Sequence, residues 1–228
     1  MKTVEIIFED DNIVVVNKPS GMVVHSAPGH SELSLADYLA KTRKSMYECG
    51  SRERPGVVHR LDIGTSGVMV FAKTPRAYRM LREEFESHIS IRKTYLAVLH
   101  GSPKTKSGRI DNTIGRKPWD SKRMAVDVPD GKRAVSEWMV LAKKSGLSLV
   151  EFVIETGRTH QIRVHSAYLG CPIVGDDLYG DAIKDNRLKI KPKRPLLHAV
   201  MISFKHPTTG RIVEFASHPP SDIVYATL

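Results

Sequence analysis

The sequence predicts an α+β fold, in which runs of β-strands are interrupted by a few helices. Seven apolar segments closed by turn residues are typical of strands: residues 13–16, 68–71, 94–99, 135–141, 147–154, 196–204 and 212–215. Three segments between them carry helical signals instead. Since these helices do not alternate regularly with the strands, the order favours an α+β domain over a chain of βαβ units.

Turn sequences delimit several of these strands. Strand 13–16 runs into Lys18-Pro19-Ser20-Gly21, and the last two strands are separated by His206-Pro207-Thr208-Thr209-Gly210. Proline and glycine are the residues that most often interrupt regular structure. The first segment therefore predicts a turn after the strand, and the second predicts a hairpin.

Capping residues locate the starts of two helices. Ser34-x-x-Asp37 is a variant of the capping box and predicts a helix over residues 35–46. Thr74 followed by Pro75 predicts a second helix that begins with a capping side chain and a proline. The apolar face of this second helix follows from helical spacing: Tyr78, Leu81, Phe85 and Ile89.

Length and composition indicate a globular protein with a basic surface. The 228 residues include 35 Lys and Arg against 25 Asp and Glu, a net charge of +10. With 41% hydrophobic and 26% charged residues the chain is not disordered, and two cysteines cannot form a disulfide framework. No apolar run approaches the ~18 residues of a membrane span, and no signal peptide is recognisable. We expect a cytoplasmic protein with a polyanionic partner, nucleic acid before a membrane surface.

A third helix is predicted over residues 159–169, with Gly170 as its natural stop. It carries His160 and His165, whose five-residue spacing misses the i, i+4 geometry of a helical metal pair. We expect these histidines to have a structural or an RNA-contacting role. Motifs of phosphate loops, dinucleotide binding, zinc enzymes and serine hydrolases are also missing from the sequence. The chemistry is therefore expected to rely on side chains alone, with no metal and no cofactor.

The most informative segment is the polar stretch Val57-Val58-His59-Arg60-Leu61-Asp62-Ile63-Gly64-Thr65-Ser66-Gly67. Apolar residues precede and follow it, so it predicts a loop between strands, where catalytic groups are often found. Taken alone, Asp62 is better explained as a turn residue that caps Thr65 or Ser66.

Together with five other segments, this stretch resembles the RluA family of RNA pseudouridine synthases. The signature is carried by His59-Arg60-Leu61-Asp62 with Thr65-Ser66-Gly67. The other segments follow in the family's order: Asn17-Lys18-Pro19-Ser20-Gly21, Arg92-Lys93-Thr94-Tyr95, residues 156–165 (Thr-Gly-Arg-Thr-His-Gln-Ile-Arg-Val-His), Gly175-Asp176 with Tyr179-Gly180, and Leu197-His198-Ala199. The similarity runs from about residue 13 to residue 215, nearly the whole chain.

The resemblance implies a fold, a reaction and a domain organisation. The fold is the pseudouridine synthase catalytic fold, a mixed and largely antiparallel central sheet with flanking helices and an active-site cleft. The reaction breaks the bond between uracil and ribose, rotates the base and reattaches it through carbon, without metal or cofactor. Larger members carry an S4 RNA-binding domain before the catalytic part. Because the first motif begins at Asn17, we expect residues 1–228 to be a single catalytic domain of the short form, without an S4 domain.

The resemblance also assigns the catalytic residues. Asp62 is the essential carboxylate, and Arg163 is expected to pair with it and orient it. Two routes are open to the Asp62 carboxylate: attack on the ribose C1′, or abstraction of a ribose proton that assists the departure of uracil. The ring of Tyr95 is expected to stack on the uracil, and its hydroxyl to serve a proton transfer at C5.

Residues around these three are assigned to RNA binding: His59, Arg60, Thr65, Arg158 and His160. Arg60 precedes Asp62 by two positions, so in an extended segment both side chains project from the same face. Since C1′ and C5 are inaccessible in a stacked base, the target nucleotide must be extruded. We expect Arg60 to help extract this nucleotide or to hold its phosphate.

The positive charge is concentrated in two segments. Residues 104–133 contain nine basic and four acidic residues, and residues 184–194 contain six and one, so each has a net charge of +5. Such runs are often only a solvated face. With the family resemblance they predict phosphate-binding loops beside the cleft. The assigned contacts are Lys117, Lys122, Arg123, Lys189, Lys191 and Lys193, and Trp119 is a candidate for stacking on a base.

The sequence therefore predicts an enzyme that isomerises uridines of ribosomal RNA, transfer RNA or both, with a stem-loop as the favoured context. We expect a monomer whose partner is RNA. The competing hypothesis is a catalytically silent RNA-binding factor in ribosome assembly, which would have no use for Asp62, Tyr95 and Arg163 together. A nuclease or phosphotransfer enzyme would need metal ligands or an acid–base histidine pair, which we could not assemble from the sequence.

Overall fold

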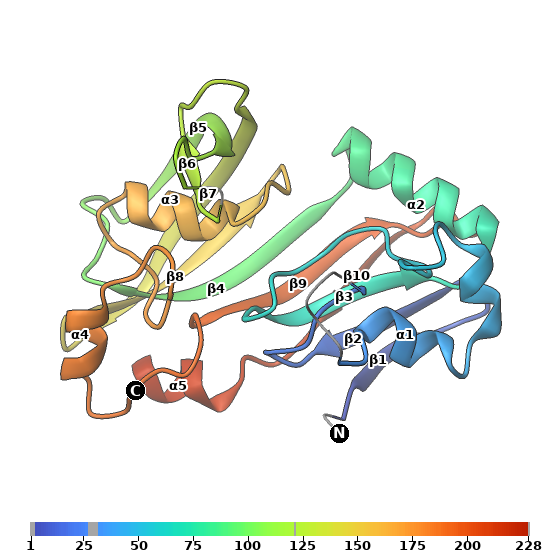
Figure 1. The fold of residues 1–228 in the computed structure, drawn as a ribbon, viewed down its shortest axis with the longest axis horizontal. Helices are drawn as coiled ribbons and strands as arrows, with labels where there is room; N and C mark the ends of the chain where they lie inside the picture. The colour runs from blue at the N-terminus through green and yellow to red at the C-terminus, as the bar shows by residue number, and fades with distance from the viewer. Residues whose placement is uncertain (1–2, 27–31, 121, 228) are drawn as a thin grey trace. The chain divides into compact units, whose positions relative to one another are not determined.

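The structure is a computed structural model and describes residues 3–26, 32–120 and 122–227. The chain divides into two compact units, each formed from two stretches of sequence (Figure 1). Unit 1 comprises Met1–Arg92 and Ala199–His218, and unit 2 comprises Lys93–His198 and Pro219–Leu228. Both units combine antiparallel β-sheet with helices, which confirms the predicted α+β class. The expectation of a single catalytic domain over residues 1–228 stays a prediction.

Unit 1 is built on strands in the order β1, β2, β3, β9, with β10 beside β9. Their bounds are β1 (Glu5–Glu9), β2 (Ile13–Lys18), β3 (Ser66–Ala72), β9 (Leu197–Lys205) and β10 (Ile212–Ala216). β2 pairs antiparallel with β1 and with β3, and β10 pairs antiparallel with β9. Every residue of β3 and all but one of β2 are buried, so these two strands form the core of the unit.

The backbones of β3 and β9 approach each other closely at Gly67. This residue has a φ of 123°, and a Cβ placed on it would lie 2.2 Å from the carbonyl oxygen of Ala199. A side chain at this position is therefore excluded both by backbone conformation and by space.

The helices of unit 1 are α1 (Leu35–Ala40), the short 3-10 helix η1 (Lys44–Glu48) and α2 (Pro75–Ser87). Both predicted caps are confirmed. The Ser34 hydroxyl accepts a hydrogen bond from the Asp37 N–H, and the Thr74 hydroxyl accepts one from the Ala77 N–H. The capped starts of both helices were thus readable from local sequence.

Two helix predictions in unit 1 were wrong at the C-terminal end. The helix predicted over residues 35–46 ends at Ala40. One more helical turn would place Thr42 and Arg43, both polar, on the buried face of the helix. The Arg43 Nε donates to Glu9 of β1 at 2.8 Å instead. Ile89 does not belong to the apolar face of α2. The helix has already ended at His88, which adopts a left-handed φ of 57°, and Ile89 is 85% exposed.

Unit 2 contains strands in the order β4, β8, β7, β5, β6, and each neighbouring pair is antiparallel. The strands are β4 (Arg92–His100), β5 (Ser107–Arg116), β6 (Met124–Val126), β7 (Lys132–Lys144) and β8 (Leu147–Ile154). The helices are α3 (Gln161–Tyr168), α4 (Ala182–Arg187) and α5 (Ser221–Thr227). None of the helices in the described ranges is long and apolar enough to cross a membrane.

All seven predicted strands are confirmed, with shifts at their ends, and the hairpin predicted at residues 206–210 joins β9 to β10. The elements β1, β5, β6, α4 and α5 were not predicted. β5 has no regular alternation of apolar and polar residues, so its own sequence does not predict a strand. It is stabilised as a strand by pairing with β7. Across that pair, Arg109 bonds Glu137 at 2.9 Å and Arg133 bonds Asp111 at 2.6 Å.

Candidate active site

The loop that carries Asp62 lies between Val57 and the start of β3, as predicted. Val57 forms an isolated antiparallel bridge with Phe71 of β3. Leu61 is buried, whereas Arg60 is exposed and Asp62 is half-buried. This alternation is that of an extended segment in which Arg60 and Asp62 share a face. The loop ends in a turn, where the Thr65 N–H donates to the Asp62 carbonyl at 3.1 Å.

The turn after β2 holds this loop in place, a role that sequence reasoning missed. The Lys18 ammonium is fully buried and donates to the carbonyls of Met22 at 2.8 Å and Ile63 at 3.2 Å. The Ser20 hydroxyl donates to the Gly64 carbonyl at 2.8 Å, and the Gly21 N–H donates to Ile63 at 2.7 Å. The backbone directly after Asp62 is thus fixed by three bonds, two to the Ile63 carbonyl and one to the Gly64 carbonyl.

Two of the residues assigned to RNA binding, His59 and Thr65, belong to this loop. The His59 ring stacks on Phe85 of α2 with ring centroids 4.6 Å apart. Its Nε2 accepts the Val70 N–H at 3.1 Å, which leaves the ring proton on Nδ1 in the neutral form. Thr65 is 2% exposed, and its hydroxyl has no hydrogen-bond partner among the described residues.

Tyr95 and Arg163 belong to unit 2, on β4 and α3. Tyr95 is buried and pairs in register with Phe152 of β8. The Arg163 guanidinium is also buried and forms a two-pronged ion pair with Asp176, at 2.7 Å from Nε and 2.7 Å from Nη2. It bonds Asp177 at 3.0 Å and lies 5.3 Å from the centre of the Tyr179 ring. Arg163 is therefore held in one orientation by partners from the segment 176–179.

Asp176 is ionised in this pair. Burial on its own raises the pKa of this carboxyl, but the Arg163 guanidinium and the N–H groups of Leu178 and Tyr179 outweigh it and lower the pKa. Both N–H groups bond Oδ1 at 3.0 Å. Since the pair is almost dry and well hydrogen-bonded, loss of either partner would leave an uncompensated buried charge.

A buried polar network anchors the third motif to β7. Thr156 Oγ1 accepts the Val135 N–H at 2.9 Å and donates to Gln161 Oε1 at 2.7 Å. The Gln161 amide in turn donates to the Val135 carbonyl and to the Ser136 hydroxyl, both at 2.9 Å. His165 is also buried, and its Nδ1 lies 2.9 Å from the Ser136 hydroxyl. Burial lowers the pKa of His165 to about 4. Its structural role stays a prediction, as does the alternative of RNA contact.

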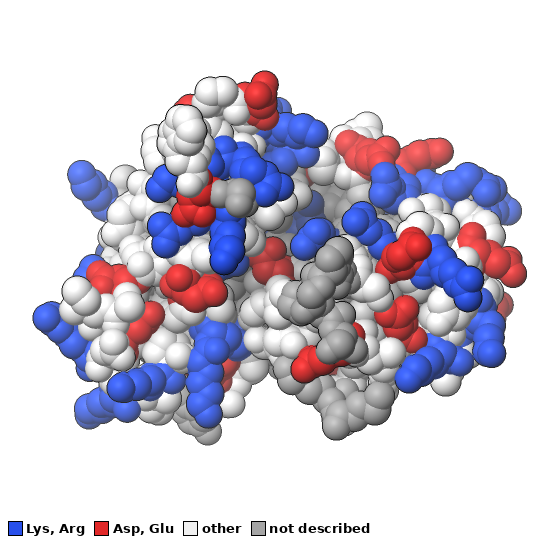
Figure 2. Space-filling model, viewed as in Figure 1, with Lys and Arg blue, Asp and Glu red and all other residues white. Residues whose placement is uncertain are grey.

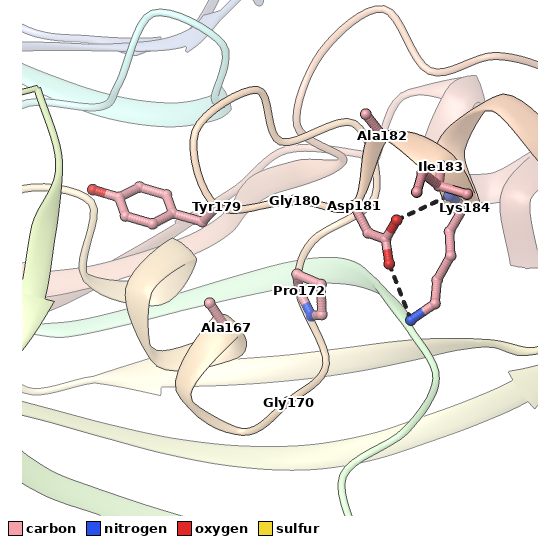
Figure 3. A pocket seen from close by; sticks show the side chains of 9 residues that line it. All are labelled: Ala167, Gly170, Pro172, Tyr179, Gly180, Asp181, Ala182, Ile183 and Lys184. Carbon is pink, nitrogen blue, oxygen red and sulfur yellow. Dashed lines mark hydrogen bonds and ion pairs between the residues drawn. The ribbon is translucent and has the colours of Figure 1, made fainter.

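His160 contacts Tyr179, a residue that borders a pocket. Its Nδ1 is 2.9 Å from the Tyr179 hydroxyl, which also accepts the Met124 N–H at 2.7 Å. Tyr179 borders a pocket of about 460 Å³ between the end of α3 and the start of α4 (Figure 3). Most of its wall is backbone and small side chains, and Asp181 on the far side caps α4 and pairs with Lys184 at 3.3 Å.

Carboxylates neutralise part of the positive charge in both basic segments. In residues 104–133, Arg109, Arg123 and Arg133 are bound to carboxylates, and in residues 184–194, Lys184 and Arg194 are. The assigned lysines have no ion pair among the described residues: Lys117, Lys122, Lys189, Lys191 and Lys193. Figure 2 shows Lys and Arg side chains gathered over the β5–β6 hairpin with acidic residues between them. Trp119, at the tip of this hairpin, is fully exposed.

The ordered motifs, with the Asp62 loop and the buried Arg163, are features of one class of protein. Comparison with known sequences identifies this class. A family model for RNA pseudouridylate synthases matches residues 12–168. The chain belongs to this family, which confirms the predicted resemblance.

Several curated relatives are similar over nearly the whole chain. A ribosomal large subunit pseudouridine synthase D of Zymomonas mobilis is 38% identical over 231 residues, which cover 96% of this chain and 70% of the relative. An uncharacterised RNA pseudouridine synthase of Bacillus subtilis is 42% identical over 219 residues, with coverage of 96% and 70%. The chain spans 62–71% of the length of such relatives.

Solved structures confirm the pseudouridine synthase fold. The human RNA pseudouridylate synthase domain containing 4 superposes with a TM-score of 0.74 at 27% identity, covering 97% of this chain and 91% of that one. The human domain containing 1 superposes with a TM-score of 0.77 at 26% identity, covering 96% and 84%. The pairing of Asp62 with Arg163 stays a prediction, as do the roles of the other assigned residues.

Proposed function

We propose that this chain is an RNA pseudouridine synthase that isomerises specific uridines without a metal or a cofactor. The observation that carries the proposal is the family match over residues 12–168, which includes the Asp62 loop, Tyr95 and Arg163. Two further observations support it. The backbone beyond Asp62 is fixed by Lys18, Ser20 and Gly21, and Arg163 is fixed by Asp176.

In this proposal Asp62 is the catalytic carboxylate, and Arg163 pairs with it and orients it. Tyr95 stacks on the target uracil and serves the proton transfer at C5. Asp62 either attacks C1′ or removes a ribose proton, and both routes need an oriented anion beside the ribose. Arg60, which is exposed on the same loop, extracts the nucleotide or holds its phosphate.

RNA binding is proposed for the unpaired lysines of the two basic segments, together with His59, Thr65, Arg158 and His160. Ribosomal RNA is the favoured substrate because one similar protein is named for the large ribosomal subunit, and transfer RNA is the second candidate. A monomer in the cytoplasm completes the proposal. Relatives from Oryza sativa and Arabidopsis thaliana are named as chloroplastic, so a plastid is the other compartment to examine in a plant.

The test uses RNA that carries tritium at C5 of uracil, because formation of pseudouridine must release this hydrogen. We expect the wild-type protein to release tritium and Asp62→Asn to release none, while both bind the RNA with similar affinity. Asp37→Asn, which changes a carboxylate on α1 in the same unit, is the matched control and should keep activity. RNA binding without tritium release from ribosomal or transfer RNA would replace the proposal by a catalytically silent binding factor.

A further inference from the structure

Lys93 is a buried cation with little to neutralise it. Its side chain is 5% exposed, and among the described residues its ammonium donates only to the Thr156 carbonyl, at 3.3 Å. An ammonium has three donors, and a buried charge is costly unless it is paired. No carboxylate contacts Lys93 in the described part of the chain. Burial, and after it the charge of Arg158, lower the pKa of Lys93 to about 8.

Arg158 adds a second cation that is not neutralised. Its Nε donates to the Arg133 carbonyl at 2.9 Å, and the residue has no ion pair with a described carboxylate. Other arginines of unit 2 are different. Arg109 is bound by Glu137, and the Arg133 guanidinium is bound by Asp111. Lys93 and Arg158 are thus two cations that repel each other and have donors to spare.

Gly157 leaves the space over the Lys93 ammonium open. A Cβ placed on Gly157 would lie 3.4 Å from Nζ, and apart from its chain neighbours no other described residue comes within 4 Å of it. The φ of Gly157 is not in the left-handed region, so its backbone does not require glycine. What a side chain there would obstruct is access to the ammonium.

The position of Lys93 relates it to the proposed chemistry. Lys93 and Tyr95 are two residues apart on β4, so their side chains leave the same face of the strand, about 7 Å apart along it. A group bound by Lys93 therefore lies beside the tyrosine that is proposed to stack on the target uracil.

We infer that Lys93 and Arg158, with Gly157 as the opening between them, form a site for one backbone phosphate of the RNA next to the target uridine. A phosphate supplies the acceptors that both cations lack, and its negative charge removes their mutual repulsion. Lys93 binds it as a point charge and Arg158 through the two ends of its guanidinium. The inference rests on the proposed function for the identity of the ligand.

The test measures how salt affects the binding of a short single-stranded oligouridylate to the full chain. Each phosphate contact contributes about −0.7 to the slope of log K against log [KCl] for a single strand. Because Lys93 and Arg158 share one phosphate, Lys93→Met/Arg158→Gln should reduce this slope by about 0.7 in total. The reductions in slope measured for Lys93→Met and for Arg158→Gln should therefore sum to more than the reduction in the double variant. Gly157→Val should reproduce the loss without changing any charge, and it serves as the second variant if the double variant does not fold.

Lys143→Met is the matched control. Lys143 is exposed on β7 and pairs with Ser148, near the start of β8. Lys93 pairs with Ile154, at the opposite end of β8, so the two lysines are far apart along this strand. Lys143→Met changes the net charge by the same amount as the single variant Lys93→Met, and it should leave the slope unchanged. An unchanged slope in the double variant or in Gly157→Val would overturn the site, and so would additive losses in the two single variants.

Tritium release separates this inference from the proposed function. Release by the wild type together with an unaltered slope in the double variant overturns the phosphate site and leaves the function standing. A reduced slope in a protein that releases no tritium supports the phosphate site, and it refutes only the catalytic proposal. A lower turnover number in Lys93→Met at saturating RNA, with an unaltered slope, would assign Lys93 to proton transfer and overturn the phosphate site.

Discussion

Replacing Lys93 by methionine should make the RNA-free protein more stable at pH 7, although it removes a proposed binding residue. Methionine has a similar length and no charge, so it fills the same buried space without the desolvation penalty. Burial and the charge of Arg158 depress the pKa of Lys93 from 10.5 to about 8. Below pH 8 the folded protein therefore carries a buried, protonated amine, which costs free energy that the unfolded state does not pay.

The magnitude follows from the pKa difference. A difference of about 2.5 units corresponds to about 3 kcal/mol of destabilisation, which is fully present below pH 8. Between pH 8 and 10.5 the unfolded state binds more protons than the folded state, so the stability of the wild type rises with pH. The variant also loses the bond to the Thr156 carbonyl, which offsets about 1–2 kcal/mol. We expect a net gain of about 1–2 kcal/mol at pH 7, or about 2–8 °C in Tm.

The assay is calorimetric unfolding of Lys93→Met, Lys143→Met and the wild type at several values between pH 7 and pH 10.5. Other groups titrate in all three proteins and cancel in the differences. The advantage of Lys93→Met should be largest at pH 7, shrink as the pH rises above 8 and reverse before pH 10.5, because the variant still lacks the bond to Thr156. Lys143→Met should stay within about 0.5 kcal/mol of the wild type. A variant that is less stable than the wild type at pH 7, or whose advantage does not change with pH, would refute the account of Lys93 as an unneutralised buried cation.

Three other predictions concern residues outside this site. As the pH falls from 6.5 to about 4, His165 is protonated in the unfolded state but stays neutral in the folded state. The unfolding free energy, measured by urea titration, should therefore fall by about 3 kcal/mol over this range, and it should fall less in His165→Gln. Lys18→Met should cost about 2–4 kcal/mol of unfolding free energy and reduce tritium release, because it frees the Asp62 loop, whereas the exposed Lys44→Met should do neither. Trp119→Ala should leave the unfolding free energy within about 0.5 kcal/mol of the wild type but weaken oligouridylate binding, measured by anisotropy, by about 1–3 kcal/mol. Equal binding by Trp119→Ala would show that the ring does not stack on RNA.

Elements with a complete local signal were predictable. β8 has the bounds expected from its sequence, because every second residue is buried and the strand carries its own alternating pattern. The start of α2 was equally clear, since Thr74 and Pro75 determine it with contacts inside a single turn. Strand β5 had no such signal. Its stability comes from β7, through ion pairs such as Arg109 with Glu137 that join positions far apart in the sequence.

The positions of the candidate site residues could be predicted from the sequence, but the hydrogen bonds and ion pairs that hold these residues in place could not. The family resemblance located Asp62, Tyr95 and Arg163, and the motifs that contain them are matched by the family model. It did not reveal what holds them. Lys18 supports the loop through the Ile63 carbonyl, 45 positions away, and Arg163 is oriented by Asp176. Hydrogen bonds from a side chain to a distant backbone leave no pattern in a single sequence.

The close approach of Gly67 to Ala199 has a consequence for how the protein is made. A ribosome completes β3 long before it reaches β9, and residues 93–196, nearly all of unit 2, are synthesised between them. During that interval the nascent chain carries an apolar strand whose partner on one side does not yet exist, a state prone to pairing with other chains. The unit that carries Asp62 is thus begun first but cannot be completed until most of unit 2 has been synthesised, and its safe assembly depends on how long the growing chain is shielded.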